Sequence, residues 1–210
     1  MKCSPAVHRA IIVADVAKFG DPARTNPHQV AVRDGMYKAL TRTFARSRIR
    51  WGACTHEDRG DGVLILVPPD VPKTWLVTRL PGPLAAELTR HNATNPAQAQ
   101  IRLRIALHAG EIIHDRYGVA GSAINRTSRL SDAPALKTAF AATDDVLALI
   151  ASDWFYEEVI RHEPATQPFS YRKVTVSVKE THATAWIRLV GTAAAAAAPD
   201  DMELHLTPAS

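Results

Sequence analysis

The sequence HEDRGDGVLILV, residues 56–67, joins a polar, glycine-containing segment to an apolar run of strand length. Residues 48–55 before it also have the composition of a strand, so the pattern predicts a β-hairpin with a tight turn. Asp61 lies at this turn, at the start of the apolar strand. Asp15 has a similar setting, because it directly follows the apolar residues 11–14 and ends that predicted strand segment. If these two strand ends converge, Asp15 and Asp61 would hold a hard divalent cation.

The composition is that of a globular chain with one main domain. The 210 residues are 46% apolar and 22% charged, with a formal net charge of +4. Basic residues are scattered, so we expect no nucleic-acid partner. No apolar run approaches the roughly 20 residues of a membrane span, and no long apolar stretch at the N-terminus indicates a signal peptide. The two cysteines, Cys3 and Cys54, lack metal-ligand spacing, which favours a reducing, cytoplasmic location.

Apolar periodicity predicts alternating strands and helices over one domain, residues 1–190. Strands are expected at residues 7–16, 48–55, 63–67, 101–113, 171–178 and 183–189. Helices are expected at residues 26–47, 75–91, 122–131 and 144–150, the last with a possible extension to residue 160. This order predicts an α+β fold, a mixed antiparallel sheet with covering helices. Residues 191–210 contain six consecutive alanines and predict a mobile C-terminal tail.

Three further segments carry candidate binding groups. The loop after the first strand contains Phe19 and Gly20 and can present backbone N–H groups to an anion, although an ordinary turn has the same composition. Asn125 and Arg129 are four residues apart on a predicted helix and share one face, which is also typical of a solvated surface. Lys179 is expected late on an edge-like strand, where a lysine can simply protect the sheet edge from aggregation.

These motifs, in this order, resemble the catalytic domain of class III nucleotide cyclases, the adenylate and guanylate cyclase family. The resemblance covers residues 7–190, and it rests on Asp15-Val16, on Gly60-Asp61, on the segment from Gly121 through Asn125 to Arg129, and on Val178-Lys179. It implies the class III cyclase fold, a ferredoxin-like mixed antiparallel sheet with covering helices. It also implies conversion of a nucleoside triphosphate to a 3′,5′-cyclic monophosphate and pyrophosphate.

The resemblance implies a role for each matched residue. Asp15, Val16 and Asp61 would hold two Mn²⁺ or Mg²⁺ ions through oxygen. Phe19 and Gly20 would form the phosphate loop. The other side chains have separate tasks: Asn125 would orient the ribose, Arg129 would stabilise charge on the reacting phosphate, and Lys179 would bind the triphosphate. In the family the metal carboxylates and the Asn, Arg and Lys positions come from different subunits, so we expect a homodimer with shared sites.

Glu57 and Gly118 occupy the positions that recognise the base in this family, and they match neither well-known pattern. Adenylate cyclases have Lys with Asp or Thr there, and guanylate cyclases have Glu with Cys. An ionised carboxylate only accepts hydrogen bonds, so Glu57 disfavours ATP and suits the imide N–H of uracil or the N1–H of guanine. Gly118 offers no side chain, which weakens the case for GTP. UTP is the first expectation and GTP the second, with cytidylate and adenylate cyclase as further alternatives.

The chain is also similar to the stand-alone pyrimidine cyclases of bacterial anti-phage systems. That similarity implies a cyclic UMP second messenger, which a separate effector would bind. An alternative from a different class is a catalytically inactive cyclase-homology module that binds a nucleotide without turnover, because function belongs to the site and not to the fold. Metal-dependent release of pyrophosphate distinguishes these two hypotheses.

Overall fold

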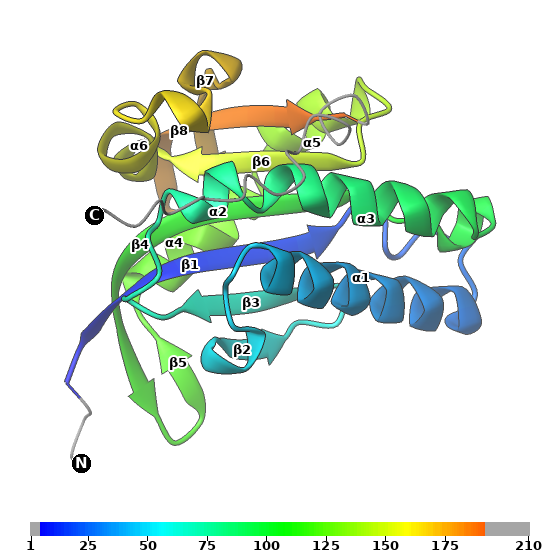
Figure 1. The fold of residues 1–210 in the computed structure, drawn as a ribbon, viewed down its shortest axis with the longest axis horizontal. Helices are drawn as coiled ribbons and strands as arrows, with labels where there is room; N and C mark the ends of the chain where they lie inside the picture. The colour runs from blue at the N-terminus through cyan, green and yellow to red at the C-terminus, as the bar shows by residue number, and fades with distance from the viewer. Residues whose placement is uncertain (1–4, 192–210) are drawn as a thin grey trace, which may run out of the picture.

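A computed structural model describes residues 5–191, and one eight-stranded sheet forms its centre (Figure 1). The strand order is β2-β3-β1-β4-β6-β8-β7, and β5 pairs with β4 outside this path. The strands are β1 Val7–Val16, β2 Thr55–Asp58, β3 Gly62–Val67, β4 Leu103–Asp115, β5 Gly118–Ala120, β6 Leu147–Ser152, β7 Arg172–Val178 and β8 Thr181–Val190. The α-helices are α1 Asn26–Arg46, α2 Trp75–Thr78, α3 Pro81–Ala93, α4 Ser122–Ser131, α5 Pro134–Ala141 and α6 Asp153–Phe155.

Most neighbouring strands of the sheet are antiparallel. β1 pairs antiparallel with both β3 and β4, whereas β4 and β6 run parallel. The middle of β1 is completely apolar, and Ile11 and Ile12 are almost fully buried because helices cover both faces of the sheet there. The predicted α+β fold with a mixed, largely antiparallel sheet is confirmed.

Two layers of helices cover the sheet. α1 and α3 lie in front of the strands in Figure 1 and pack on them through a core that includes Met36, Leu40 and Leu84. α4 and α5 cover the opposite face, where Leu130 and Leu136 belong to a second apolar cluster. Side chains alternate between the two faces along a strand, so Asp15 shares the α4 side with the preceding odd-numbered residues of β1.

The β-hairpin is shorter than predicted. Residues 48–55 are not a strand, because Trp51–Ala53 forms a 3-10 helix and β2 starts only at Thr55. Arg48 has a φ of +59°, a left-handed conformation that interrupts an extended chain. The Trp51 ring then stacks on the His56 ring, with 3.9 Å between the centroids. This aromatic contact folds the segment back on the start of β2.

The prediction of a helix at residues 144–150 is wrong, because most of this segment belongs to strand β6. All residues of β6 are buried, and the strand lies between β4 and β8. A strand that is buried on both faces has no alternation, so periodicity cannot distinguish it from a buried helix. Helical structure begins after Ser152, whose hydroxyl accepts a hydrogen bond from the Phe155 N–H at 3.1 Å.

The predicted mobile tail, residues 191–210, lies outside the described residues except for Gly191. Within residues 5–191, no helix is both long enough and apolar enough to cross a bilayer.

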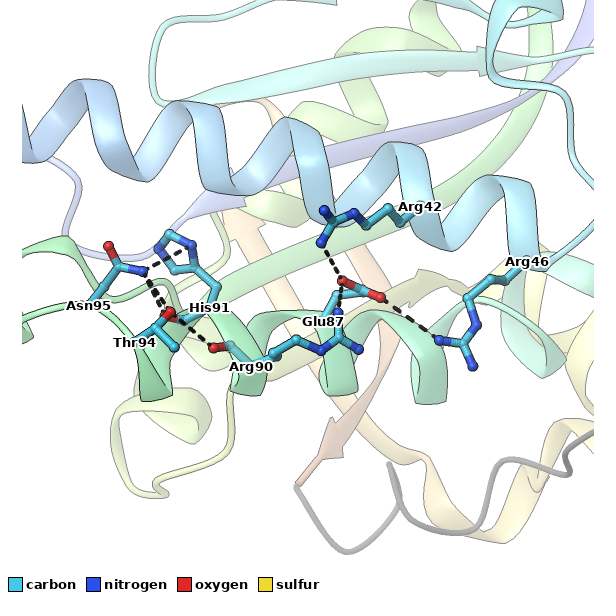
Figure 2. Close-up of polar contacts among 7 residues, drawn as sticks. All are labelled: Arg42, Arg46, Glu87, Arg90, His91, Thr94 and Asn95. Carbon is cyan, nitrogen blue, oxygen red and sulfur yellow. Dashed lines mark hydrogen bonds and ion pairs between the residues drawn. The ribbon is translucent and has the colours of Figure 1, made fainter.

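A buried carboxylate connects the two front helices, as Figure 2 shows. The side chain of Glu87 on α3 is only 5% exposed, and three arginines surround it. It accepts hydrogen bonds from Arg90 and, at 3.5 Å, from Arg42, and it lies 3.8 Å from Arg46. Arg42 and Arg46 belong to α1, so this cluster compensates the buried charge and ties α1 to α3.

Gly35 on α1 lies at a tight contact with α3. A Cβ atom there would lie 2.4 Å from Cε1 of His91 on α3 and 2.9 Å from Cδ1 of Ile101. The imidazole is held in place, because its Nε2 donates to the Ala99 carbonyl at 3.0 Å. We expect Gly35→Ala to lower the free energy of unfolding by about 1–3 kcal/mol, since overpacking outweighs the gain of about 1 kcal/mol in helix propensity. Urea denaturation followed by circular dichroism measures this change.

The double variant Gly35→Ala/His91→Ala is the matched control. Removal of the ring opens the space, so alanine at position 35 should be neutral or stabilising in the His91→Ala background. A Gly35→Ala single variant that is more stable than the wild type would contradict the tight contact.

Candidate active site

The pairing of β1 with β3 places Asp15 and Asp61 side by side. Asp15 is opposite Gly62 in the register, and the Val16 N–H donates to the Asp61 carbonyl at 3.0 Å. A Cβ atom at position 62 would lie 2.2 Å from the Ala14 carbonyl oxygen, so this close approach of two backbones requires glycine. The structure therefore brings together the three residues predicted to bind metal, Asp15, Val16 and Asp61.

Helix α1 holds the turn that carries Asp61. The carboxylate of Asp58 accepts the Gly60 N–H at 2.9 Å, and it also accepts the Tyr37 hydroxyl and the Arg33 guanidinium, both at 2.7 Å. These contacts hold the pKa of Asp58 below its usual value, with the Tyr37 hydrogen bond as the main cause. Asp58 is therefore a structural anchor of the turn.

Asp15 forms an ion pair with an arginine that the sequence analysis did not identify. Arg104 on β4 lies opposite Asp15 in the register, and its Nη2 donates to the carboxylate. Burial is the main cause that raises the pKa of Asp15, the charge of Asp61 raises it further, and Arg104 opposes the shift. The alternation of residues 101–105 does place Arg102 and Arg104 on one face of a strand, but it does not reveal the partner.

Asp61 and the predicted phosphate loop line the same hollow. Phe19, Gly20, Gly60 and Asp61 lie on its wall together with residues of the first turns of α1, and its volume is about 520 Å³. Lys18 begins the loop with a φ of +54°. The structure thus places the candidate phosphate-binding loop next to one of the two carboxylates, around a space of ligand size.

Asn125 and Arg129 lie on α4, as predicted, while Lys179 lies in the turn between β7 and β8 instead of on a strand. Arg129 donates to Glu180 at 3.5 Å, which brings this turn to the last turn of α4. The Nε atom of Arg129 is buried and has no hydrogen-bond partner among the described residues. Arg129 and Lys179 therefore form a second group of candidate site residues, and the guanidinium has unused donors.

Glu57 and Gly118 are neighbours in space. Gly118 has a φ of +138°, and a Cβ atom there would lie 2.7 Å from Oε1 of Glu57. The other oxygen, Oε2, accepts a hydrogen bond from Nη2 of Arg59 at 2.8 Å. The two residues predicted to recognise the base thus lie together, and Arg59 completes the group.

Within the described part of the chain, no hydrogen bond or ion pair joins Asp15 or Asp61 to Asn125, Arg129 or Lys179. That part also contains no group of three or more His, Cys, Asp or Glu side chains that could hold a metal ion. The candidate residues thus lie in three places: Asp15 and Asp61 at the strand ends, Arg129 and Lys179 near the end of α4, and Glu57 beside Gly118.

No protein-family model matches the sequence, and no curated protein matches it. Solved structures match the fold. The guanylyl cyclase Cya2 aligns with a TM-score of 0.59 at 15% identity, over 90% of this chain and 94% of that chain. An adenylate/guanylate cyclase/hydrolase from Silicibacter pomeroyi aligns with a TM-score of 0.60 at 19% identity, over 88% of this chain and 97% of that chain. The guanylate cyclase domain of RhGC from Catenaria anguillulae, in complex with GTP, aligns with a TM-score of 0.53 at 13% identity. The alignment covers 88% of this chain and 96% of that chain. The protein thus has the fold of class III nucleotide cyclase catalytic domains.

Proposed function

We propose that the protein is a nucleotide cyclase that converts a nucleoside triphosphate to a 3′,5′-cyclic monophosphate and pyrophosphate. The observation that carries this proposal is the pair Asp15 and Asp61 at adjacent strand ends, next to the hollow lined by Phe19 and Gly20. Paired carboxylates beside a backbone loop suit a triphosphate that arrives with divalent cations. The fold, shared with a cyclase domain in complex with GTP, supports this function.

Asp15, Asp61 and the backbone of Val16 fit two Mn²⁺ or Mg²⁺ ions, because these ions prefer carboxylate and carbonyl oxygens. The charge of Asp61 raises the pKa of Asp15, and a cation shared by the two carboxylates would remove this repulsion. When bound, the ions supply Lewis-acid activation of the 3′-hydroxyl and charge neutralisation at the phosphates. Arg104 would then leave Asp15 and have its donors free for a phosphate oxygen.

The other residues position the substrate and compensate charge. Asn125 holds the ribose so that its 3′-oxygen faces the α-phosphate. Arg129 donates to the reacting phosphate, where negative charge grows as the bond to pyrophosphate breaks. Lys179 and the backbone N–H groups of Phe19 and Gly20 bind the remaining phosphates.

A second copy of the chain completes each site. One subunit supplies Asp15 and Asp61, and the other supplies Asn125, Arg129 and Lys179. This division follows the family resemblance. A two-fold dimer then contains two equivalent sites.

Glu57 recognises the base, with UTP as the favoured substrate and GTP as the next. Its carboxylate accepts hydrogen bonds only, and Arg59 beside it adds donors. An acceptor next to a donor matches the adjoining N–H and C=O groups of uracil, and also those of guanine. The favoured product, cyclic UMP, would serve as an anti-phage second messenger for a separate effector.

One observation favours a second candidate function, a cyclase-homology module that binds a nucleotide without turnover. The guanidinium of Arg104 occupies an oxygen of Asp15 that a metal ion would need. In that case the same pockets bind a nucleotide, and no pyrophosphate is released.

The first test uses purified protein with Mn²⁺ and UTP, CTP, GTP or ATP in separate reactions, analysed by mass spectrometry. We expect one cyclic monophosphate, from UTP. Asp61→Asn should lower its rate by more than about 100-fold, because even indirect disturbance of a metal ligand costs 10- to 100-fold. Nucleotide binding without any product would support the inactive module instead, and neither binding nor product would overturn both functions.

The second test concerns Glu57. Glu57→Lys replaces an acceptor with donors, so the ratio of kcat/KM for UTP to that for ATP should fall at least about tenfold, which corresponds to about 1.4 kcal/mol. Glu157→Lys is the matched control, since Glu157 forms an ion pair with Arg161 away from the candidate site. An unchanged ratio in Glu57→Lys would exclude Glu57 as the residue that recognises the base.

The third test concerns the shared sites. Asp61→Ala and Arg129→Ala homodimers should both be inactive, while a mixture of the two variants should regain activity from the one intact site of each heterodimer. With random exchange of subunits, about a quarter of the wild-type activity is expected. Absence of recovery, with exchange verified by tagged subunits, would show that the site lies within one chain.

A further inference from the structure

A second hollow, of about 600 Å³, lies beside the candidate active site and is strongly basic. It is bounded by the loop after β1, by the segment before β4 and by α5. One acidic side chain, Asp21, and five cationic side chains line it. The cations are Lys18, Arg24, Arg102, Arg104 and Lys137. It shares no lining residue with the hollow of Phe19, Gly20 and Asp61, so the two hollows flank the same loop as separate spaces.

Three of the five cations in the basic hollow, Lys18, Arg24 and Arg102, form no ion pair with the described residues. Nη2 of Arg24 donates to the Gln100 carbonyl at 2.9 Å, and Nη1 is buried with no hydrogen-bond partner among the described residues. Arg102 donates to three backbone carbonyls, at 2.6, 2.7 and 2.9 Å. Carbonyl oxygens satisfy hydrogen bonds but do not cancel a unit charge. Burial lowers the pKa of both arginines, and the charges of Asp21 near Arg24 and of Asp144 and Asp145 near Arg102 oppose this shift. Lys18 has no ion-pair partner within residues 5–191.

The two remaining cations connect the basic hollow to the carboxylate pair. Lys137 donates to Asp132 at 3.1 Å, and Arg104 donates to Asp15. The charge of Asp132 also contributes to the raised pKa of Asp15, so these groups share one local field. Arg104 is the group common to both places, because it lines the hollow and holds the candidate metal ligand.

Two glutamines, Gln98 and Gln100, also line the hollow, and the remaining lining residues are apolar: Phe140, Ala17, Ala23, Ala97 and Ala141. The volume falls within the roughly 300–1,000 Å³ of small-molecule sites. A bare inorganic ion would contact the cations but leave these walls uncovered. A phosphate group on a compact organic body matches both the charge and the walls.

We propose that the basic hollow is a second anion site, which binds a small phosphorylated molecule other than the substrate and draws Arg104 away from Asp15. An anion in the hollow competes with Asp15 for the guanidinium, and this releases a carboxylate oxygen for the metal. The coupling is reciprocal, since a metal ion on Asp15 also frees Arg104 for the anion. Binding of the anion stands on its own, whereas its effect on the metal rests on the proposed function.

The binding test titrates inorganic pyrophosphate into the full chain in EDTA, by isothermal titration calorimetry. Without divalent cations the active site presents the carboxylates of Asp15 and Asp61, which repel the probe. We expect pyrophosphate to bind to a single class of sites. Arg24→Gln and Lys137→Gln should each weaken this binding at least about tenfold, because each variant loses one charged hydrogen bond. Lys38→Gln is the matched control, since Lys38 pairs with Asp34 at 2.7 Å on α1, outside the hollow, and it should bind like the wild type.

Three results would overturn the anion site. The first is no binding by the wild type. The second is equal weakening in Lys38→Gln, which would indicate unspecific attraction. The third is weakening in Arg129→Gln and Lys179→Gln but not in Arg24→Gln and Lys137→Gln, which would place the probe among the proposed triphosphate ligands. Circular dichroism verifies that each variant is folded.

The coupling test measures Mn²⁺ binding by electron paramagnetic resonance while sulfate replaces chloride at constant ionic strength. Sulfate should tighten Mn²⁺ binding at least about fivefold in the wild type and have no such effect in Lys137→Gln. No change in the wild type would overturn the coupling. Neither readout depends on turnover. If the cyclase proposal fails, the protein forms no cyclic product but still binds pyrophosphate, so the two failures can be distinguished.

Discussion

The hydrogen bond from the Val16 N–H to the Asp61 carbonyl, at 3.0 Å, joins the end of β1 to the turn before β3. Glycine at position 62 permits it, because a Cβ atom there would collide with the Ala14 carbonyl. A shift of the register by one residue would move Asp15 to the other face of the sheet, among the apolar side chains under α1 and α3. The buried pairing of β1 with both neighbours excludes that shift. The position of the two carboxylates is therefore a consequence of core packing as much as of the turn itself.

The sequence predicts best what depends on local pattern. α1 and α4 have helical spacing, and β1 is an apolar run of strand length that ends in a carboxylate. Asp15, Asn125 and Arg129 lie at the expected places on β1 and α4. Prediction fails where contacts distant in sequence decide: β6 has no alternation because both its faces are buried, and the segment at Trp51 is bent by its contact with His56. Arg104 was missed for the same reason, since Asp15 is 89 residues away and only the pairing of β1 with β4 makes them neighbours.

The ion pair of Arg104 with Asp15 follows from the burial of both groups, whose side chains are 12% and 16% exposed. A carboxylate this buried, close to the charge of Asp61, needs a compensating cation. Without metal, the guanidinium is that cation. If a divalent ion takes its place, Arg104 must find another anion, and it can do so on a triphosphate or in the basic hollow. Metal and anion binding are then linked through one side chain, with no rearrangement of the fold.

Gly118 illustrates how an absent side chain can contribute to recognition. Considered alone, it only lacks the group that guanylate cyclases use to contact guanine. In the structure it leaves the space that Oε1 of Glu57 needs, while Arg59 occupies Oε2. Among the described residues, Oε1 has no hydrogen-bond donor of its own, so it is the oxygen most open to a base under the proposed function. The pairing edge of guanine presents two donor groups, N1–H and the amino group, whereas that of uracil presents a single N–H between two carbonyls, one of which Arg59 can meet. If Glu57 recognises the base as proposed, this arrangement favours uracil over guanine, in the same order as the residue types.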